Sequence, residues 1–119
     1  MDEAGFQQVI EQGVALQQTF SELGSVAVGG TAAALHCQHR FSMDVDCVTP
    51  LLRQRYDAVA EAIERWEGWR TSRKNPPVLI LGERGGVQLG LRQQRWEIPL
   101  RTMTLRGLRV PTPAETLVI

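Results

Sequence analysis

Apolar residues recur at steps of three and four near the start of the chain, which is the spacing of one face of an α-helix. The members of this stripe are Phe6, Val9, Ile10, Leu16, Phe20 and Leu23. Since glycine commonly ends a helix, we predict an amphipathic helix that ends at Gly24 and covers a sheet. A second stripe with this spacing consists of Leu52, Tyr56, Val59, Ile63 and Trp66. It predicts another helix that frays by Trp69 and has ended before Pro76, because proline cannot continue a helix.

Short runs of β-favouring residues lie between these stripes. Ser25–Val28 predicts a strand that stops at Gly29 and Gly30, and Thr31–Leu35 predicts the first turns of a helix directly afterwards. Polar and apolar residues alternate over Met43–Thr49, which predicts a strand with one face in the core.

The second half of the chain continues with β structure. Residues 78–81 and 87–91 predict two strands, and the glycine-rich residues 82–86 predict the hairpin turn that joins them. We expect further β structure within residues 95–110. Residues 111–113 are Pro-Thr-Pro, which is typical of the entrance to a helix.

Length and composition allow one domain, because 119 residues of which 43% are hydrophobic suffice for one core and not for two. The 13 basic and 13 acidic residues give a net charge of zero, which excludes recruitment to a polyanion by total charge alone. The charge is nevertheless uneven. Residues 1–50 hold one basic residue, Arg40, against six acids, whereas residues 51–119 hold twelve against seven. We expect a site that uses carboxylates in the first part and a positive face in the second.

The first residues do not predict a secretory signal. Met1–Glu3 is acidic and leads directly into the first amphipathic stretch, unlike a secretory signal peptide. The longest uncharged stretch ends at Arg40 and contains Gly24, Gly29 and Gly30, so it does not predict a membrane-spanning helix. We expect a cytoplasmic protein that does not bind membranes and keeps its two cysteines reduced.

Two acids on the predicted strand 43–49 are the first candidates for chemistry. Asp44 and Asp46 are two positions apart, so at ~3.3 Å rise per residue their Cβ atoms leave the same face roughly 6.5 Å apart. Such a pair suits a shared metal ion, because a divalent cation such as Mg²⁺ relieves the repulsion between the two carboxylates. The alternative is a solvated edge of an amphipathic strand, with Val45 and Cys47 facing the core.

The glycine turn before the second predicted helix is the other candidate. Gly29 and Gly30 let the backbone approach a phosphate, and the helix that begins near Thr31 offers unpaired N–H donors at its N-terminus. A plain strand-to-helix turn explains the same residues.

Two further clusters carry weaker signals. A zinc site could use His36, Cys37, His39 and Cys47, but their spacings match none of the usual zinc motifs, so core cysteines and surface histidines are the favoured interpretation. The arginines that could supply a positive face for RNA or a protein partner are Arg92, Arg95, Arg101, Arg106 and Arg109. The alternative for these is a solvated face that reflects composition.

Taken together, the glycine turn and the acid pair form the pattern Gly-Gly-Thr-Ala, a helix, then His-Arg-x-Ser-x-Asp-x-Asp, ending at Asp46. This pattern resembles the AbiEii-type toxins of type IV toxin–antitoxin systems, within the DNA polymerase beta-like nucleotidyltransferase superfamily. Residues 107–117 also resemble the segment that closes that family's catalytic core, so the likeness covers residues 25–119 in outline.

The resemblance implies an α/β (α+β) nucleotidyltransferase-like core, a mixed and mainly antiparallel sheet with helices packed on one side. It implies Mg²⁺-dependent transfer of a nucleoside monophosphate from a nucleoside triphosphate to an RNA or protein acceptor, by the toxin of a pair with an antitoxin. The triphosphate would rest on Gly29, Gly30 and Thr31, and Asp44 and Asp46 would hold Mg²⁺. Arg40 would bridge the acids or meet a phosphate. Ser42 would bind the phosphates or tie down the loop.

The sequence departs from this family at the third carboxylate, which the superfamily supplies from a neighbouring strand. Gly90 stands at that position, in the run 87–91. Glu97 could substitute as a metal ligand and Glu83 lies in the predicted turn, although neither spacing matches well. The family's C-terminal helical region is also missing from this sequence, so we expect a single domain over residues 1–119. A degenerate module that binds a nucleotide or a partner without transfer is the alternative function.

Overall fold

The computed structural model describes residues 3–37, 44–95 and 101–113. Its main feature is a five-stranded mixed sheet in the order β1-β2-β5-β4-β3. The strands are β1 (Val26–Val28), β2 (Asp44–Thr49), β3 (Arg70–Asn75), β4 (Leu79–Arg84) and β5 (Val87–Gln93). Strands β2 and β5 run parallel, and the other neighbours run antiparallel. The predicted fold class is confirmed in this part.

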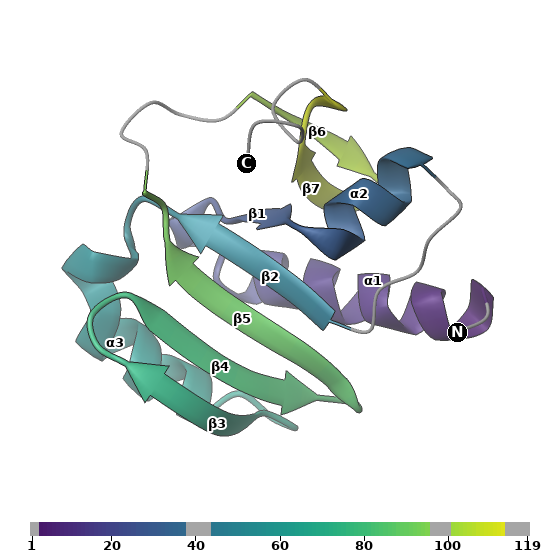
Figure 1. Ribbon diagram of the computed structural model, residues 1–119. Helices are drawn as coiled ribbons and strands as arrows, with labels where there is room; N and C mark the ends of the chain where they lie inside the picture. Colours follow the sequence, from purple (N-terminus) through teal and green to yellow (C-terminus); the bar gives the residue numbers. More distant parts are fainter. Residues whose placement is uncertain (1–2, 38–43, 96–100, 114–119) are drawn as a thin grey trace.

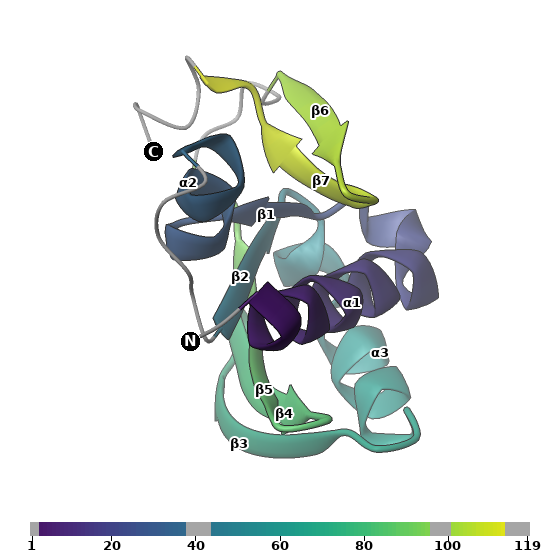
Figure 2. The ribbon, with the colours of Figure 1, turned by 90° about the vertical axis from the view of Figure 1, so that its right-hand side faces the viewer.

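Two helices, α1 (Glu3–Thr19) and α3 (Leu52–Glu64), cover one face of the sheet (Figures 1 and 2). A third, α2 (Gly30–Cys37), lies beside β1 and β2. None of the helices and strands that the structure describes covers the opposite face of the central strands in Figure 2. The sheet therefore has one apolar face for the core and one face available for a site.

The core confirms both predicted helical stripes. The buried residues of α1 and α3 that pack on the sheet include Phe6, Val9, Ile10, Leu16, Leu52, Tyr56, Val59 and Ile63. Beneath them lie the alternate residues of the central strands, Val45, Cys47, Ile80, Leu89 and Leu91. The first helix ends earlier than predicted, at Thr19 rather than at Gly24. A separate 3₁₀ helix, Ser21–Leu23, follows and ends at Gly24, which has a left-handed φ of 56°.

The second predicted helix ends before Trp69 and Pro76, as expected, but its last stripe member, Trp66, lies beyond the helix. Helix α3 ends at Glu64, and the chain turns at Gly68, whose φ is 84°. Trp66 and Trp69 then stack on one another with ring centroids 6.1 Å apart. The chain continues into β3, an edge strand that the sequence analysis did not predict.

The hairpin between β4 and β5 is tighter than predicted. The strands extend to Arg84 and start again at Val87, so the turn has two residues, Gly85 and Gly86, with φ of 59° and 78°. Positive φ at both central positions is what a type I′ hairpin requires, and glycine adopts it without strain.

A two-stranded sheet completes the fold. It consists of β6 (Thr102–Leu105) and β7 (Leu108–Pro111), which confirms the β structure expected there, and β7 packs beside β1 and α1. The helix predicted after residue 111 falls largely on 114–119, outside the described residues. Within the part of the chain that the structure describes, no helix is long and apolar enough to span a membrane.

Gly82 on β4 gives a first testable prediction. A Cβ atom there would lie 2.4 Å from a ring carbon of Trp69 and 2.5 Å from the backbone oxygen of Arg70. Gly82→Ala should therefore lower the free energy of unfolding by about 2 kcal/mol, through overpacking against backbone that cannot move aside. Urea denaturation measures this, with Ser72→Ala at an exposed position of β3 as the matched control. Equal stability of the two variants would contradict the packing of Trp69 on Gly82.

Candidate functional site

The predicted acid pair lies on the open face of the sheet. Asp44 and Asp46 alternate along β2 with Val45 and Cys47, which are buried in the core on the other face. In the parallel pairing with β5, Asp44 stands opposite Gln88 and Asp46 opposite Gly90. The strand register predicted for Gly90 is thereby confirmed, and Gly90 faces the acid pair.

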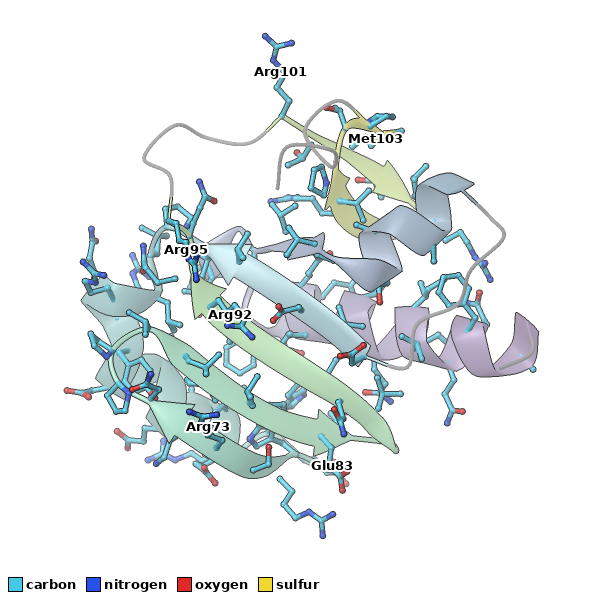
Figure 3. All side chains as sticks on the ribbon, viewed as in Figure 1. Arg73, Glu83, Arg92, Arg95, Arg101 and Met103 are labelled. Carbon is cyan, nitrogen blue, oxygen red and sulfur yellow. The ribbon has the colours of Figure 1, made fainter. Side chains whose placement is uncertain are left out.

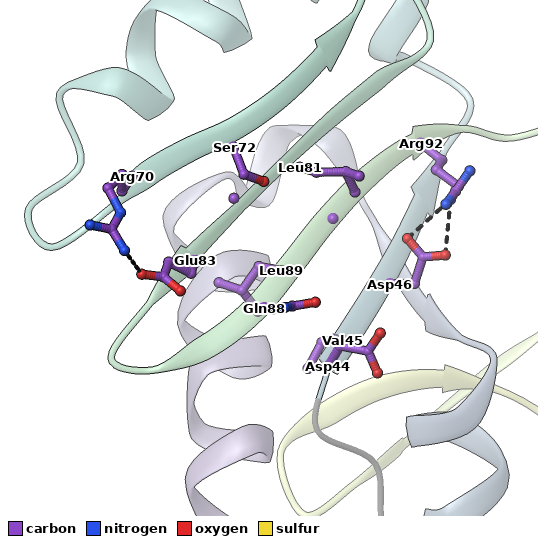
Figure 4. Close-up of a pocket in the computed structure, with 12 residues that line it drawn as sticks. Asp44, Val45, Asp46, Arg70, Ser72, Leu81, Glu83, Gln88, Leu89 and Arg92 are labelled. Atoms are coloured by element: carbon purple, nitrogen blue, oxygen red, sulfur yellow. Dashed lines mark hydrogen bonds and ion pairs between the residues drawn. The ribbon is translucent and has the colours of Figure 1, made fainter.

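A pocket of about 320 Å³ opens in front of these acids (Figure 4). Its lining comes from four strands and consists of Asp44, Val45, Asp46, Arg70, Ser72, Leu81, Gly82, Glu83, Gln88, Leu89, Gly90 and Arg92. We call it the acid pocket. At its far side Glu83, which belongs to β4 rather than to the predicted turn, is ion-paired with Arg70 on β3.

Arg92 is a member of the site that the sequence analysis placed among the arginines of a positive face for RNA or a protein partner, with a solvated face as the alternative. Its Nε donates hydrogen bonds to both carboxylate oxygens of Asp46, at 2.9 and 3.2 Å. Figure 3 shows Arg92 lying over the open face of the sheet, whereas Arg101 points away from the molecule. The available signal was the two-residue spacing of Gln88, Gly90 and Arg92, which places all three on one face of a strand.

Gly90 makes room for this ion pair. A Cβ atom at Gly90 would lie 2.8 Å from Oδ1 of Asp46 and 2.8 Å from Cδ2 of Leu81. The carboxylate of Asp46 therefore leans across the position where a side chain of residue 90 would begin. Gly90 therefore has two effects: it brings no third carboxylate to the site, and it leaves the space in which Asp46 contacts Arg92.

The glycine turn lies next to the acid pair. Val28, the last residue of β1, pairs with Asp46, and Gly29 and Gly30 follow it at the start of α2. Both glycines are exposed, and Gly29 has a φ of 73° with nothing within 4 Å of an added Cβ atom. The backbone here is open to a ligand on the side from which α2 starts.

Thr31 has a different role from the one predicted. Its side chain is buried, and its hydroxyl donates a hydrogen bond to the backbone oxygen of Asp44. The hydroxyl proton of Thr31 is thus engaged in a hydrogen bond within the protein. This bond connects the first turn of α2 to the start of β2, and the hydroxyl does not donate to a triphosphate.

This tie gives a second testable prediction. Thr31→Val keeps the shape of the side chain but removes the hydroxyl, so the free energy of unfolding should fall by about 1–2 kcal/mol. Thr31→Ser, which keeps the hydroxyl, should lose less. Thermal unfolding of the two variants would measure the difference, and a valine variant as stable as the wild type would show that the hydrogen bond contributes nothing.

Three predicted site residues, Arg40, Ser42 and Glu97, lie outside the described residues. Their assigned roles at the phosphates and the metal stay predictions. Among residues 3–37, 44–95 and 101–113, no three His, Cys, Asp or Glu side chains group together as a metal cluster.

The donors of the acid pocket fit Mg²⁺ better than zinc. Asp44 and Asp46 offer carboxylate oxygens at an open surface, the ligands that Mg²⁺ prefers, and leave its remaining positions to water or phosphate. Cys47, from the alternative zinc set, points into the core, where burial and the nearby Asp46 raise its pKa to about 12. A thiol with that pKa stays protonated, whereas zinc binds the thiolate.

The fold is similar to that of known nucleotidyltransferases. The antibiotic-resistance factor ANT(2'')-Ia matches with a TM-score of 0.63 and 17% identity, over 95% of this chain and 69% of its own. The lincosamide antibiotic adenylyltransferase LnuA, in a lincomycin-bound structure, matches with a TM-score of 0.65 and 14% identity, over 93% and 85%. For a nucleotidyltransferase-like protein from Thermotoga maritima the values are 0.60 and 14%, over 99% and 84%.

These likenesses establish the nucleotidyltransferase fold and confirm the fold class expected from the sequence. The sequence itself matches no protein-family model and no curated protein. Membership of the AbiEii-type family within this fold therefore stays a prediction.

Proposed function

We propose that this protein binds a nucleoside triphosphate with Mg²⁺ at the acid pocket and transfers its nucleoside monophosphate to an acceptor, with pyrophosphate as the leaving group. One observation carries this proposal, namely that the acid pair of β2 stands beside the exposed glycine turn at the start of α2. The fold shared with LnuA and ANT(2'')-Ia adds support.

Each group of residues would bind a different part of the Mg²⁺-triphosphate. Asp44 and Asp46 would hold Mg²⁺ through carboxylate oxygens, and the backbone N–H groups of the first turn of α2 would donate to phosphate oxygens. Gly29 would let the phosphates come close to the backbone. When bound, Mg²⁺ would offset the negative charge of the phosphates and activate the reacting oxygen.

Incubation with labelled nucleoside triphosphates and Mg²⁺ tests the transfer. The acceptors to be supplied are cellular RNA, cellular protein and the chain itself, and mass spectrometry would identify an added nucleoside monophosphate. Asp44→Asn/Asp46→Asn is the control, because it keeps the shape of both side chains and removes both charges. Product from the wild type and none from the control is the expected result, whereas equal product from both would exclude the acid pair.

A second candidate function is a binding module without transfer. Gly90 and the Asp46–Arg92 ion pair favour it, because the described part of the acid pocket brings no third carboxylate to the acid pair. Tight binding of Mg²⁺ and triphosphate by the wild type, with no product from any acceptor, would select this function.

The sequence resemblance supports a narrower proposal, namely that the chain is the toxin of a toxin–antitoxin pair that modifies RNA or protein in the cytoplasm. Expression in a bacterial host should then arrest growth, and the protein encoded beside it should relieve the arrest. Growth that is arrested equally by the Asp44→Asn/Asp46→Asn variant would contradict this proposal.

A further inference from the structure

The contact between Arg92 and Asp46 contributes little to the stability of the fold. The Arg92 side chain is 47% exposed and that of Asp46 is 36% exposed. Ion pairs this open to water contribute between zero and about 1 kcal/mol. The contact is nevertheless placed where Mg²⁺ would bind under the proposed function, since both oxygens of the Asp46 carboxylate accept from the same guanidinium N–H.

The charges around the acid pair determine how strongly Arg92 competes with a metal ion. The two carboxylates carry two negative charges, and Arg92 returns one positive charge to the same face of the sheet. Farther along the acid pocket, Glu83 and Arg70 offset each other. A divalent cation that approaches without its own anion therefore meets a guanidinium that already occupies Asp46, one of the two carboxylate ligands.

The strand geometry holds Arg92 in reach of both Asp46 and a ligand in the acid pocket. Arg92 follows Gly90 on the same face of β5, and it lines the acid pocket together with both acids. Because Gly90 lacks a side chain, the Asp46 carboxylate can lean across β5 to meet the guanidinium. A guanidinium forms forked hydrogen bonds with phosphate as readily as with carboxylate.

We infer that Arg92 makes metal binding at the acid pocket conditional on the triphosphate. Without triphosphate, the guanidinium holds Asp46 and competes with the metal. A bound triphosphate gives Arg92 a different anionic partner and releases Asp46 to the metal, so that each ligand strengthens the binding of the other. This inference rests on the proposed function, because it requires that both ligands bind at the acid pair.

The test uses Arg92→Gln, which removes the charge and the guanidinium and keeps a shorter polar side chain. Binding of Mn²⁺ alone, followed by the paramagnetic resonance signal of the free ion, should become about fivefold tighter, because the competing cation is gone. Binding of a non-hydrolysable triphosphate at saturating Mg²⁺, measured by calorimetry, should become about tenfold weaker, because a charged hydrogen-bond donor is lost. Arg73→Gln, at an exposed position of β3, is the matched control for the loss of one positive charge and should change neither affinity by more than twofold.

The opposite signs of the two changes are the signature of the inference, since a purely structural role would weaken both. Unchanged or weaker Mn²⁺ binding by Arg92→Gln, in a wild type that binds both ligands, would overturn the role of Arg92 and leave the proposed function in place. Unchanged triphosphate binding would overturn it equally. If neither the wild type nor the variant binds Mn²⁺ or the Mg²⁺-triphosphate, the proposed function fails and the inference fails with it.

Discussion

Asp44→Asn/Asp46→Asn is expected to abolish the stabilisation that Mg²⁺ and a nucleoside triphosphate give to the wild type. A ligand at one hundred times its Kd adds about 2.7 kcal/mol to the free energy of unfolding. For a domain of this size that corresponds to a rise in Tm of roughly 10 °C. The variant lacks both metal-binding charges, so its Tm should not respond. Thermal unfolding with and without the two ligands measures both responses.

The same experiment has an internal control in the acid pocket. Glu83→Gln also removes a carboxylate from the lining, but Glu83 lies across the pocket and is ion-paired with Arg70. This variant should keep most of the ligand response. If the Asp44→Asn/Asp46→Asn variant and the wild type shift equally, Mg²⁺ and triphosphate bind elsewhere and the assignment of the acid pair is wrong.

Gly90→Asp is expected to destabilise the fold in the absence of Mg²⁺ and to bind Mg²⁺ more tightly than the wild type. Without Mg²⁺ the free energy of unfolding should fall by about 2 kcal/mol, because the new Cβ atom crowds Oδ1 of Asp46 and Cδ2 of Leu81. A third carboxylate beside the acid pair adds repulsion between like charges. With Mg²⁺ that repulsion is relieved, so the variant should recover stability as the ion is added and bind it more tightly than the wild type.

The rate of nucleoside monophosphate transfer by Gly90→Asp should rise with its tighter binding of Mg²⁺. A tenfold gain corresponds to only about 1.4 kcal/mol of activation free energy, so a modest improvement in metal binding would be visible. Gly90→Ala introduces the same crowding without a carboxylate and separates the two effects. Adding Leu81→Ala to Gly90→Asp removes one of the two crowded contacts, and should raise both stability and rate. The same response to Mg²⁺ in Gly90→Asp and Gly90→Ala would show that residue 90 does not face the metal.

The sequence predicted the parts of the fold in which hydrophobic periodicity and core burial coincide. The stripe of α1 and the alternation in β2 both place apolar residues where the structure buries them, so their position and type were correct. The orientation of the acid pair followed from the period of two in β2. The facing position of Gly90 followed from the same period in β5.

Strand β3 was missed because its sequence, Arg-Thr-Ser-Arg-Lys-Asn, has no apolar alternation. Five of its six residues are exposed, and it is a strand because the edge of β4 offers backbone partners. Residues 70–75 form a strand because of their tertiary contacts, which intrinsic β-propensity does not predict. Trp66 likewise extended the helical spacing past Glu64, although it lies in the turn before β3, where it stacks on Trp69.

The role of Arg92 could not be predicted from its own surroundings in the sequence. It lies 46 residues from Asp46, and only the parallel pairing of β2 with β5 brings the two together. Thr31 shows the converse limit. Its position in the glycine turn indicated a phosphate ligand, while the direction of its hydroxyl, toward the backbone of Asp44, depends on how α2 packs against β2.

The polar character of β3 has a consequence for how copies of this protein behave in concentrated solution. An edge strand presents unpaired N–H and C=O groups, which are a template for pairing with another chain. Arg73 and Lys74 place two positive charges along that edge, and a second β3 laid against it would bring like charges together. The other edge of the sheet, β1, has only three residues. The polar residues of β3, which gave no strand pattern in the sequence, therefore also disfavour the addition of a strand from a second copy to this edge of the sheet.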